Sequence, residues 1–194
     1  EAALTVRTRE VDPAGWARAQ MNLGNVFQRQ ASRGAPGALE RAVAAYEAAL
    51  TVKTPETDPA GWALTQMNLG IALQRLGERG APGAMERAVA AYELALTVQS
   101  REIDPAAWAL TQMNLGNGLR NLGEGGAPGA LERAVAAYEA ALTVTTREGD
   151  TVGWARIQGN LAFAYLALNR TADARAAMQR AESAFEQAGD TVSV

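Results

Sequence analysis

An asparagine recurs at a constant interval along the 194-residue chain, at Asn22, Asn68, Asn114 and Asn160. An amide side chain donates to a peptide carbonyl and accepts from a peptide N–H, so a row of them can bind an extended backbone of almost any sequence. Asparagine can equally bond to a neighbouring helix or to nearby backbone. The pattern therefore predicts either a peptide-binding row or a set of structural hydrogen bonds.

Further polar side chains lie about one helical turn after these asparagines. They are Asn25, Gln28, Arg29, Gln74, Arg75, Asn117 and Arg120, with Ile71, Asn121, Phe163 and Leu166 among their counterparts in other copies. These positions vary while the neighbouring apolar positions repeat, which is typical either of a surface that selects a ligand or of drift on an unconstrained surface. With the four asparagines they form the candidate binding surface.

Catalytic chemistry has little support in the residue types available. The chain contains no Cys and no His, which removes thiol nucleophiles, imidazole bases and the common zinc ligands. The Gly-Ala-Pro-Gly segments that begin at Gly34, Gly80 and Gly126 lack the Gly-Lys-Ser/Thr ending of a phosphate-binding loop and are interpreted as turns. We expect no catalytic residues, no metal, no cofactor and no enzyme activity.

Charge and hydropathy exclude further classes of partner. The formal net charge is -3, with acidic and basic residues interspersed, so the sequence predicts binding neither to nucleic acid nor to an anionic membrane. No apolar run approaches the roughly 20 residues that cross a bilayer, and the first residues do not resemble a secretory signal. We expect a cytoplasmic protein.

The asparagines lie in a repeated segment marked by tryptophan at Trp16, Trp62, Trp108 and Trp154, at intervals of 46 residues (16 to 62, 62 to 108, 108 to 154). Asp12 before Pro13 is a good helix cap and predicts a first helix from Pro13 to about Gln30, whose equivalents end near Gly77 and Gly123. A second helix begins after Gly37. Its expected core face holds Leu39, Ala42, Val43, Tyr46, Ala49 and Leu50.

A single helix pair cannot bury its apolar face, so stacked pairs are expected to form an all-α solenoid. We divide the chain into the end of a preceding second helix (1–8), three repeats (12–52, 58–98 and 104–144) and a shorter C-terminal repeat or cap (150–189). The extra residues relative to a shorter repeat would be absorbed by longer helices. Leu4 and Val6 would leave an apolar edge that could stack on another copy of the chain.

The pattern Leu23-Gly24, then Phe27, then Ala42 and Tyr46 resembles the tetratricopeptide signature, and it returns twice more. The equivalents are Leu69-Gly70, Leu73, Ala88 and Tyr92, and Leu115-Gly116, Leu119, Ala134 and Tyr138. Two features depart from that family. Gln20 and its copies stand where the family has tryptophan, and the interval of 46 residues (16 to 62) exceeds the family's usual length of about 34.

The resemblance implies a right-handed superhelix of antiparallel helix pairs whose first helices line a concave groove. It implies a scaffold that binds a protein or peptide, and some similar bacterial arrays belong to larger signalling proteins. Self-assembly through the edges of the repeats is the alternative, with a homo-oligomer as its product.

Overall fold

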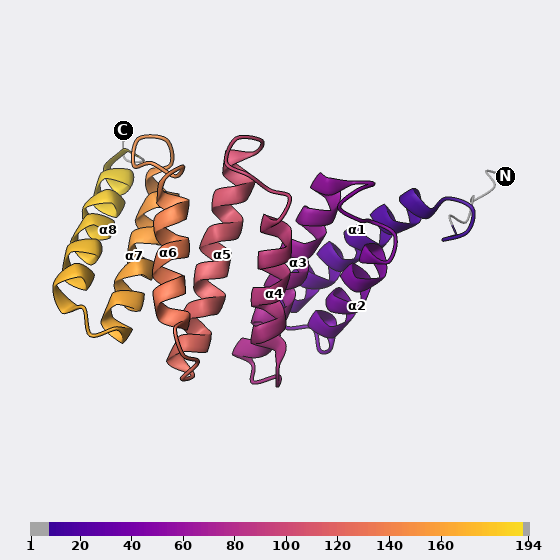
Figure 1. The fold of residues 1–194 in the computed structure, drawn as a ribbon, viewed down its shortest axis with the longest axis horizontal. Helices are drawn as coiled ribbons and strands as arrows, with labels where there is room; N and C mark the ends of the chain where they lie inside the picture. Colours follow the sequence, from indigo (N-terminus) through magenta and orange to yellow (C-terminus); the bar gives the residue numbers. More distant parts are fainter. Residues whose placement is uncertain (1–7, 192–194) are drawn as a thin grey trace. The chain divides into compact units, whose positions relative to one another are not determined.

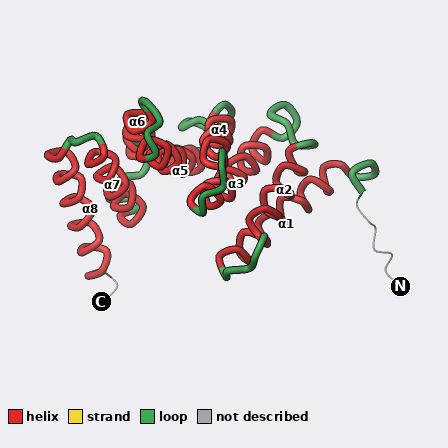
Figure 2. Tube along the Cα trace, turned by 90° about the horizontal axis from the view of Figure 1, so that it is seen from below, coloured by secondary structure: helices red, strands yellow, loops and turns green. Residues whose placement is uncertain are grey.

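The computed structural model describes residues 8–191, which form eight α-helices and no strand (Figures 1 and 2). The chain divides into two compact units, Glu1–Val98 and Gln99–Val194. The first unit contains α1 (Pro13–Ser32), α2 (Ala38–Leu50), α3 (Pro59–Glu78) and α4 (Ala84–Leu96); the second contains α5 (Pro105–Glu124), α6 (Ala130–Leu142), α7 (Thr151–Ala167) and α8 (Thr171–Thr191). The prediction of an all-α fold of antiparallel helix pairs is confirmed.

Each odd-numbered helix begins at the aspartate that the sequence marks as its cap. The carboxylate of Asp12 accepts a hydrogen bond from the backbone N–H of Gly15 at 2.9 Å, and Asp150 accepts from Gly153 at 2.8 Å. Asp58 and Asp104 make the equivalent bonds. These bonds satisfy an N–H group that has no partner within the helix.

The Gly-Ala-Pro-Gly segments form the turns within the first three pairs, as predicted. Gly34 and Gly37 have φ angles of 83° and 64°, a left-handed conformation that glycine adopts without strain. The chain reverses there, and the next helix packs antiparallel on the first (Figure 1).

In the first unit α1 packs on α2, α2 on α3, and α3 on α4. The closest approach within a pair joins a glycine to a tyrosine ring. A Cβ atom at Gly24 would lie 2.5 Å from Cε1 of Tyr46, and one at Gly70 would lie 2.5 Å from Cε1 of Tyr92. Both tyrosines are fully buried, so the glycine creates the space that the ring fills.

The second unit repeats this packing in its first pair. A Cβ at Gly116 would lie 2.6 Å from Cε1 of the buried Tyr138. In the second pair Ala162 stands at the glycine's position, and α8 buries the small residues Ala174, Ala177, Ala181 and Ala184. The exposed face of α8 is polar and includes Arg175, Gln179, Arg180, Glu182 and Glu186.

Three expectations about length need correction. The first helix continues beyond Gln30 to Ser32, and α3 and α5 end at Glu78 and Glu124. Gly77 and Gly123 are therefore not helix stops; they lie in the last turn, where a Cβ would come within 3.0 Å of Met85 and 2.5 Å of Leu131. Longer helices do not absorb the residues between the pairs, since residues 51–58 form a loop.

The expectation for residues 1–8, including Leu4 and Val6, lies outside the described residues except for Thr8. The continuity of one array across the two units, with the repeat ranges given above, stays a prediction.

Candidate functional site

A hydrogen-bonded network joins the candidate residues of α1 to those of α3. The hydroxyl of Tyr46 donates to Oδ1 of Asn25 at 2.7 Å, and Nδ2 of Asn68 donates to the same oxygen at 3.3 Å. Gln28 donates from Nε2 to the backbone carbonyl of Asn68 at 2.9 Å. Two neighbouring repeats are thus joined through one amide oxygen.

The second unit contains the same arrangement two helix pairs further along the chain. Tyr138 donates to Oδ1 of Asn117 at 2.8 Å, and Nδ2 of Asn160 donates to that oxygen at 2.9 Å. The bond between the two asparagines links α5 to α7. Because the network recurs at equivalent residues, it is a property of the repeat and not of one local accident of packing.

Tyr92, the second buried tyrosine of the first unit, has a different hydrogen-bond partner, because Ile71 replaces the asparagine found at Asn25 and Asn117. The hydroxyl of Tyr92 donates to Oε1 of Gln74 at 3.0 Å, while Nε2 of Gln74 donates to Glu78 at 3.0 Å. Arg75 donates from Nη1 to Oγ of Ser32 at 2.9 Å and so joins α3 to the end of α1. Gln74 and Arg75 are half-buried at this surface.

Arg120 is the candidate residue with the most constrained charge. Its Nη1 pairs with Oε1 of Glu124 at 2.5 Å, and its Nε is buried without a hydrogen-bond partner.

Burial raises the pKa of Tyr138 to about 12, against an opposing effect of the Arg120 guanidinium. Burial also raises the pKa of Tyr46 and Tyr92 well above the ordinary tyrosine value. All three hydroxyls therefore stay protonated donors.

The remaining candidates are more open. Asn22 and Arg29 are exposed on α1, and Asn114 is half-buried on α5. The sequence interpretation missed the buried tyrosines as hydrogen-bond donors to the candidate residues, because it treated them as packing residues only. Their type was a usable signal, since a buried tyrosine, unlike phenylalanine, needs a partner for its hydroxyl.

Two asparagines of the row therefore already make hydrogen bonds within the protein. The Nδ2 groups of Asn68 and Asn160 each donate to an asparagine of the preceding repeat. An amide oxygen has two lone pairs, so Oδ1 of each remains suited to a peptide N–H. Peptide binding at these residues stays a prediction.

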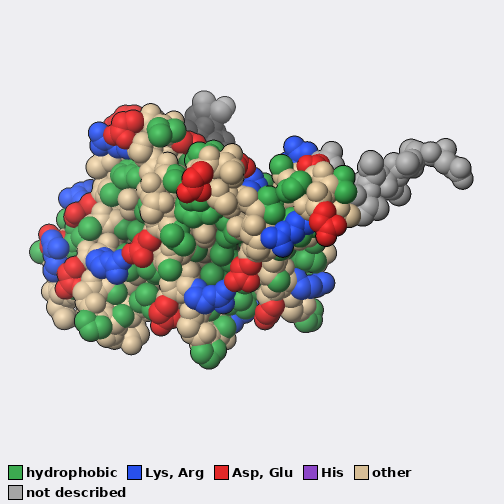
Figure 3. Space-filling model, turned by 45° about the vertical axis from the view of Figure 1, so that its right-hand side comes forward, with side chains coloured by type: hydrophobic (Ala, Val, Ile, Leu, Met, Phe, Trp, Pro, Cys, Tyr) green, Lys and Arg blue, Asp and Glu red, His purple; other side chains and the backbone are tan. Residues whose placement is uncertain are grey.

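The surface carries mixed charge. On the face that Figure 3 presents, acidic and basic side chains alternate with apolar and polar ones. Among the described residues there is no group of three or more carboxylates that could hold a metal ion. Within the same residues, none of the helices has the length and hydropathy needed to span a membrane.

We expect Asn117→Ala to lower the free energy of unfolding by about 1–3 kcal/mol, because it leaves the hydroxyl of Tyr138 and Nδ2 of Asn160 without their acceptor. Urea unfolding monitored by circular dichroism measures the change. Asn22→Ala is the matched control, since Asn22 is exposed and its loss should change stability by less than about 0.5 kcal/mol. Equal effects from the two variants would mean that the network adds no stability.

Comparison with known proteins places the fold. No protein-family model and no curated protein sequence matches this chain. Among solved structures, MamA aligns with a TM-score of 0.68 at 17% identity, over 94% of this chain and 85% of its own. BtubC from P. vanneervenii aligns with a TM-score of 0.73 at 21% identity, over 96% of this chain and 68% of its own. These likenesses show a fold of the tetratricopeptide-like helical-repeat kind.

Proposed function

We propose that this chain is a protein-interaction scaffold, whose first helices bind an extended peptide or a partner helix. The observation that carries the proposal is the tyrosine–asparagine–asparagine network, which occurs in both units with the same geometry. It holds amide groups in fixed positions on helices that the fold places next to one another.

Fixed amides favour binding because the ordering of side chains is already complete before a ligand arrives. Oδ1 of Asn68 and of Asn160 would accept from peptide N–H groups, while the exposed Arg29 would meet a carboxylate on the ligand. Arg75 is held by Ser32 and Arg120 by Glu124. The ligand is thus expected to contribute backbone hydrogen bonds first and acidic side chains second.

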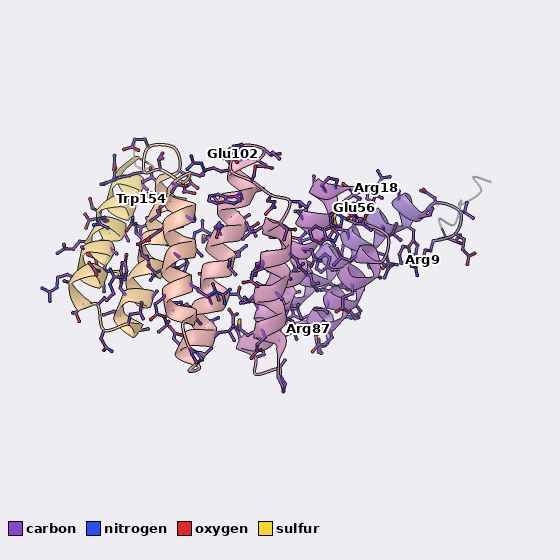
Figure 4. All side chains as sticks on the ribbon, viewed as in Figure 1. Arg9, Arg18, Glu56, Arg87, Glu102 and Trp154 are labelled. Atoms are coloured by element: carbon purple, nitrogen blue, oxygen red, sulfur yellow. The ribbon has the colours of Figure 1, made fainter. Side chains whose placement is uncertain are left out.

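Selection from a displayed peptide library, followed by calorimetry with the selected peptides, tests this proposal. The combined substitution Asn22→Ala, Asn68→Ala and Asn114→Ala should weaken binding at least about tenfold, which corresponds to about 1.4 kcal/mol. The control is Glu47→Ala with Arg87→Ala, which removes an exposed ion pair between α2 and α4 (Arg87 is labelled in Figure 4). Equal affinities for the two variants, both shown to be folded by circular dichroism, would refute the proposed surface.

Self-assembly is the second candidate, and the exposure of α1 favours it. Leu23 and Val26 are 43% and 40% exposed, whereas their equivalents Leu69 and Ala72 are 7% and 0% exposed. Apolar side chains that are buried in one repeat and open in another are typical of an unfilled stacking surface. Light scattering on the same proteins separates the two functions. If the triple asparagine variant loses peptide binding while its oligomer size is unchanged, the scaffold is supported. If the oligomer size falls, and only in Leu23→Ser, self-assembly is supported.

A further inference from the structure

The second unit has an open cavity of about 330 Å³ between α5, α7 and the loop that joins α6 to α7. Its wall is largely apolar and includes Ala109, Leu110, Met113 and Ile157. The loop contributes Thr145 and Asp150. They lie next to the N-terminal end of α7, the helix on which Figure 4 labels Trp154. A largely apolar cavity next to a carboxylate is a combination that can hold an amphipathic group.

In the first unit a lysine of the protein itself lines the equivalent hollow. Lys53 follows α2 in the first unit and Thr145 follows α6 in the second, so the two residues occupy equivalent positions of the repeat. The Lys53 side chain is 12% exposed, and its ammonium pairs with the carboxylate of Asp58. This ion pair, together with a backbone N–H of Gly61, lowers the pKa of Asp58. Lysine is rarely so buried without a partner.

Glycine makes this close approach possible. A Cβ atom at Gly61 would collide with Nζ of Lys53 and with the carboxylate of Asp58. The second unit has Gly153 at the same position, beneath the carboxylate of Asp150. Both units therefore have the glycine, the capping aspartate and the hollow, but the second unit has the short Thr145 where the first has a lysine.

We propose that the cavity of the second unit binds the side chain of a lysine from a partner protein. The ammonium would contact Oδ2 of Asp150, whose Oδ1 is already used by the N–H of Gly153. The four methylene groups would lie against Met113 and Ile157. The inference does not depend on the asparagine surface, because none of its residues belongs to that surface.

An arginine in the lining does not oppose this ligand. Arg156 lines the cavity but is exposed to solvent, so its charge is strongly screened. In the first unit Arg18 lines the corresponding hollow, and Lys53 nevertheless pairs with Asp58. The aspartate carboxylate, and not the charge of the arginine in the lining, therefore determines whether an ammonium group can bind.

Titration of the full chain with Nα-acetyl-lysine methylamide, followed by methyl NMR, tests the proposal. We expect shifts at the Met113 and Ile157 methyl groups, and binding at least about tenfold weaker for pentanol and pentanoate, which match the size but lack the ammonium. Equal binding of pentanol or pentanoate would overturn the assignment. Shifts with pentylamine but not with the lysine derivative would overturn the lysine as the source, and no shift with either amine would overturn the site.

Two substitutions connect the signal to these atoms. Thr145→Lys, which copies the residue of the first unit, should abolish the shifts, and Asp150→Asn should weaken binding at least about tenfold while it keeps an oxygen to cap α7. Conversely, Lys53→Thr should create a second amine site that shifts the methyl group of Met21, the counterpart of Met113. Unchanged shifts in folded Thr145→Lys would show that the amine binds elsewhere.

Discussion

Gly70→Ala should lower the free energy of unfolding by about 1–3 kcal/mol, even though alanine is the better helix former. The reason is the ring of Tyr92, which is fully buried and would lie 2.5 Å from the added methyl group. The ring cannot withdraw, because its hydroxyl is bonded to Gln74 and its own helix, α4, packs on α3. Urea unfolding measures the loss.

Gly159→Ala is the matched control for this prediction. Gly159 also lies inside a helix, α7, but a methyl group there would meet nothing within 4 Å. The usual helix preference for alanine should then raise the free energy of unfolding by about 0.5–1 kcal/mol. The opposite signs expected for the same substitution isolate the contact with Tyr92, and equal signs would contradict it.

Tyr138→Ala is expected to cost about 3–5 kcal/mol, the largest loss among these variants, because it empties the centre of the α5–α6 pair. Tyr138 is fully buried against Gly116, and its hydroxyl is bonded to Asn117. Alanine would leave a cavity and would remove one of the two donors to the amide oxygen of Asn117. Thermal and urea unfolding would show a large shift of the midpoint.

Tyr138→Phe separates the ring from the hydroxyl. It keeps the packing but removes one donor, so it should cost about 0.5–1.5 kcal/mol. Its effect combined with Asn117→Ala should be less than the sum of the two, since both changes break the same bond. A phenylalanine variant as unstable as the alanine variant would mean that the hydroxyl, and not the ring, stabilises the pair.

The helix pairs could be predicted because their signals are local. Asp12 caps a helix through a backbone group three residues away, and Gly34 and Gly37 turn the chain within a few residues. The apolar periodicity of α2 selected Leu39, Tyr46 and Ala49, all of which are buried. Interactions of such short range depend on neighbours in the sequence, so they can be recognised there.

The hydrogen-bonding partners of the asparagines could not be predicted in the same way. Asn68 meets Asn25 across 43 residues, and the contact depends on how α1 and α3 lie against one another. The sequence left two interpretations of these amides open. The structure shows that the side chains of Asn68 and Asn160 bond to the neighbouring helix, while the ligand-binding interpretation stays a proposal.

The sequence by itself determined an all-α chain of helix pairs with a repeated row of amides, because capping, turn formation and apolar periodicity are properties of short segments. Only the tertiary structure decided what equivalent residues do. Leu23 is exposed where Leu69 is buried, and Lys53 pairs with Asp58 at a hollow whose counterpart in the second unit has the short Thr145 instead. Burial and cavity volume depend on which elements pack around a residue, and that information is not present in the residue's own segment.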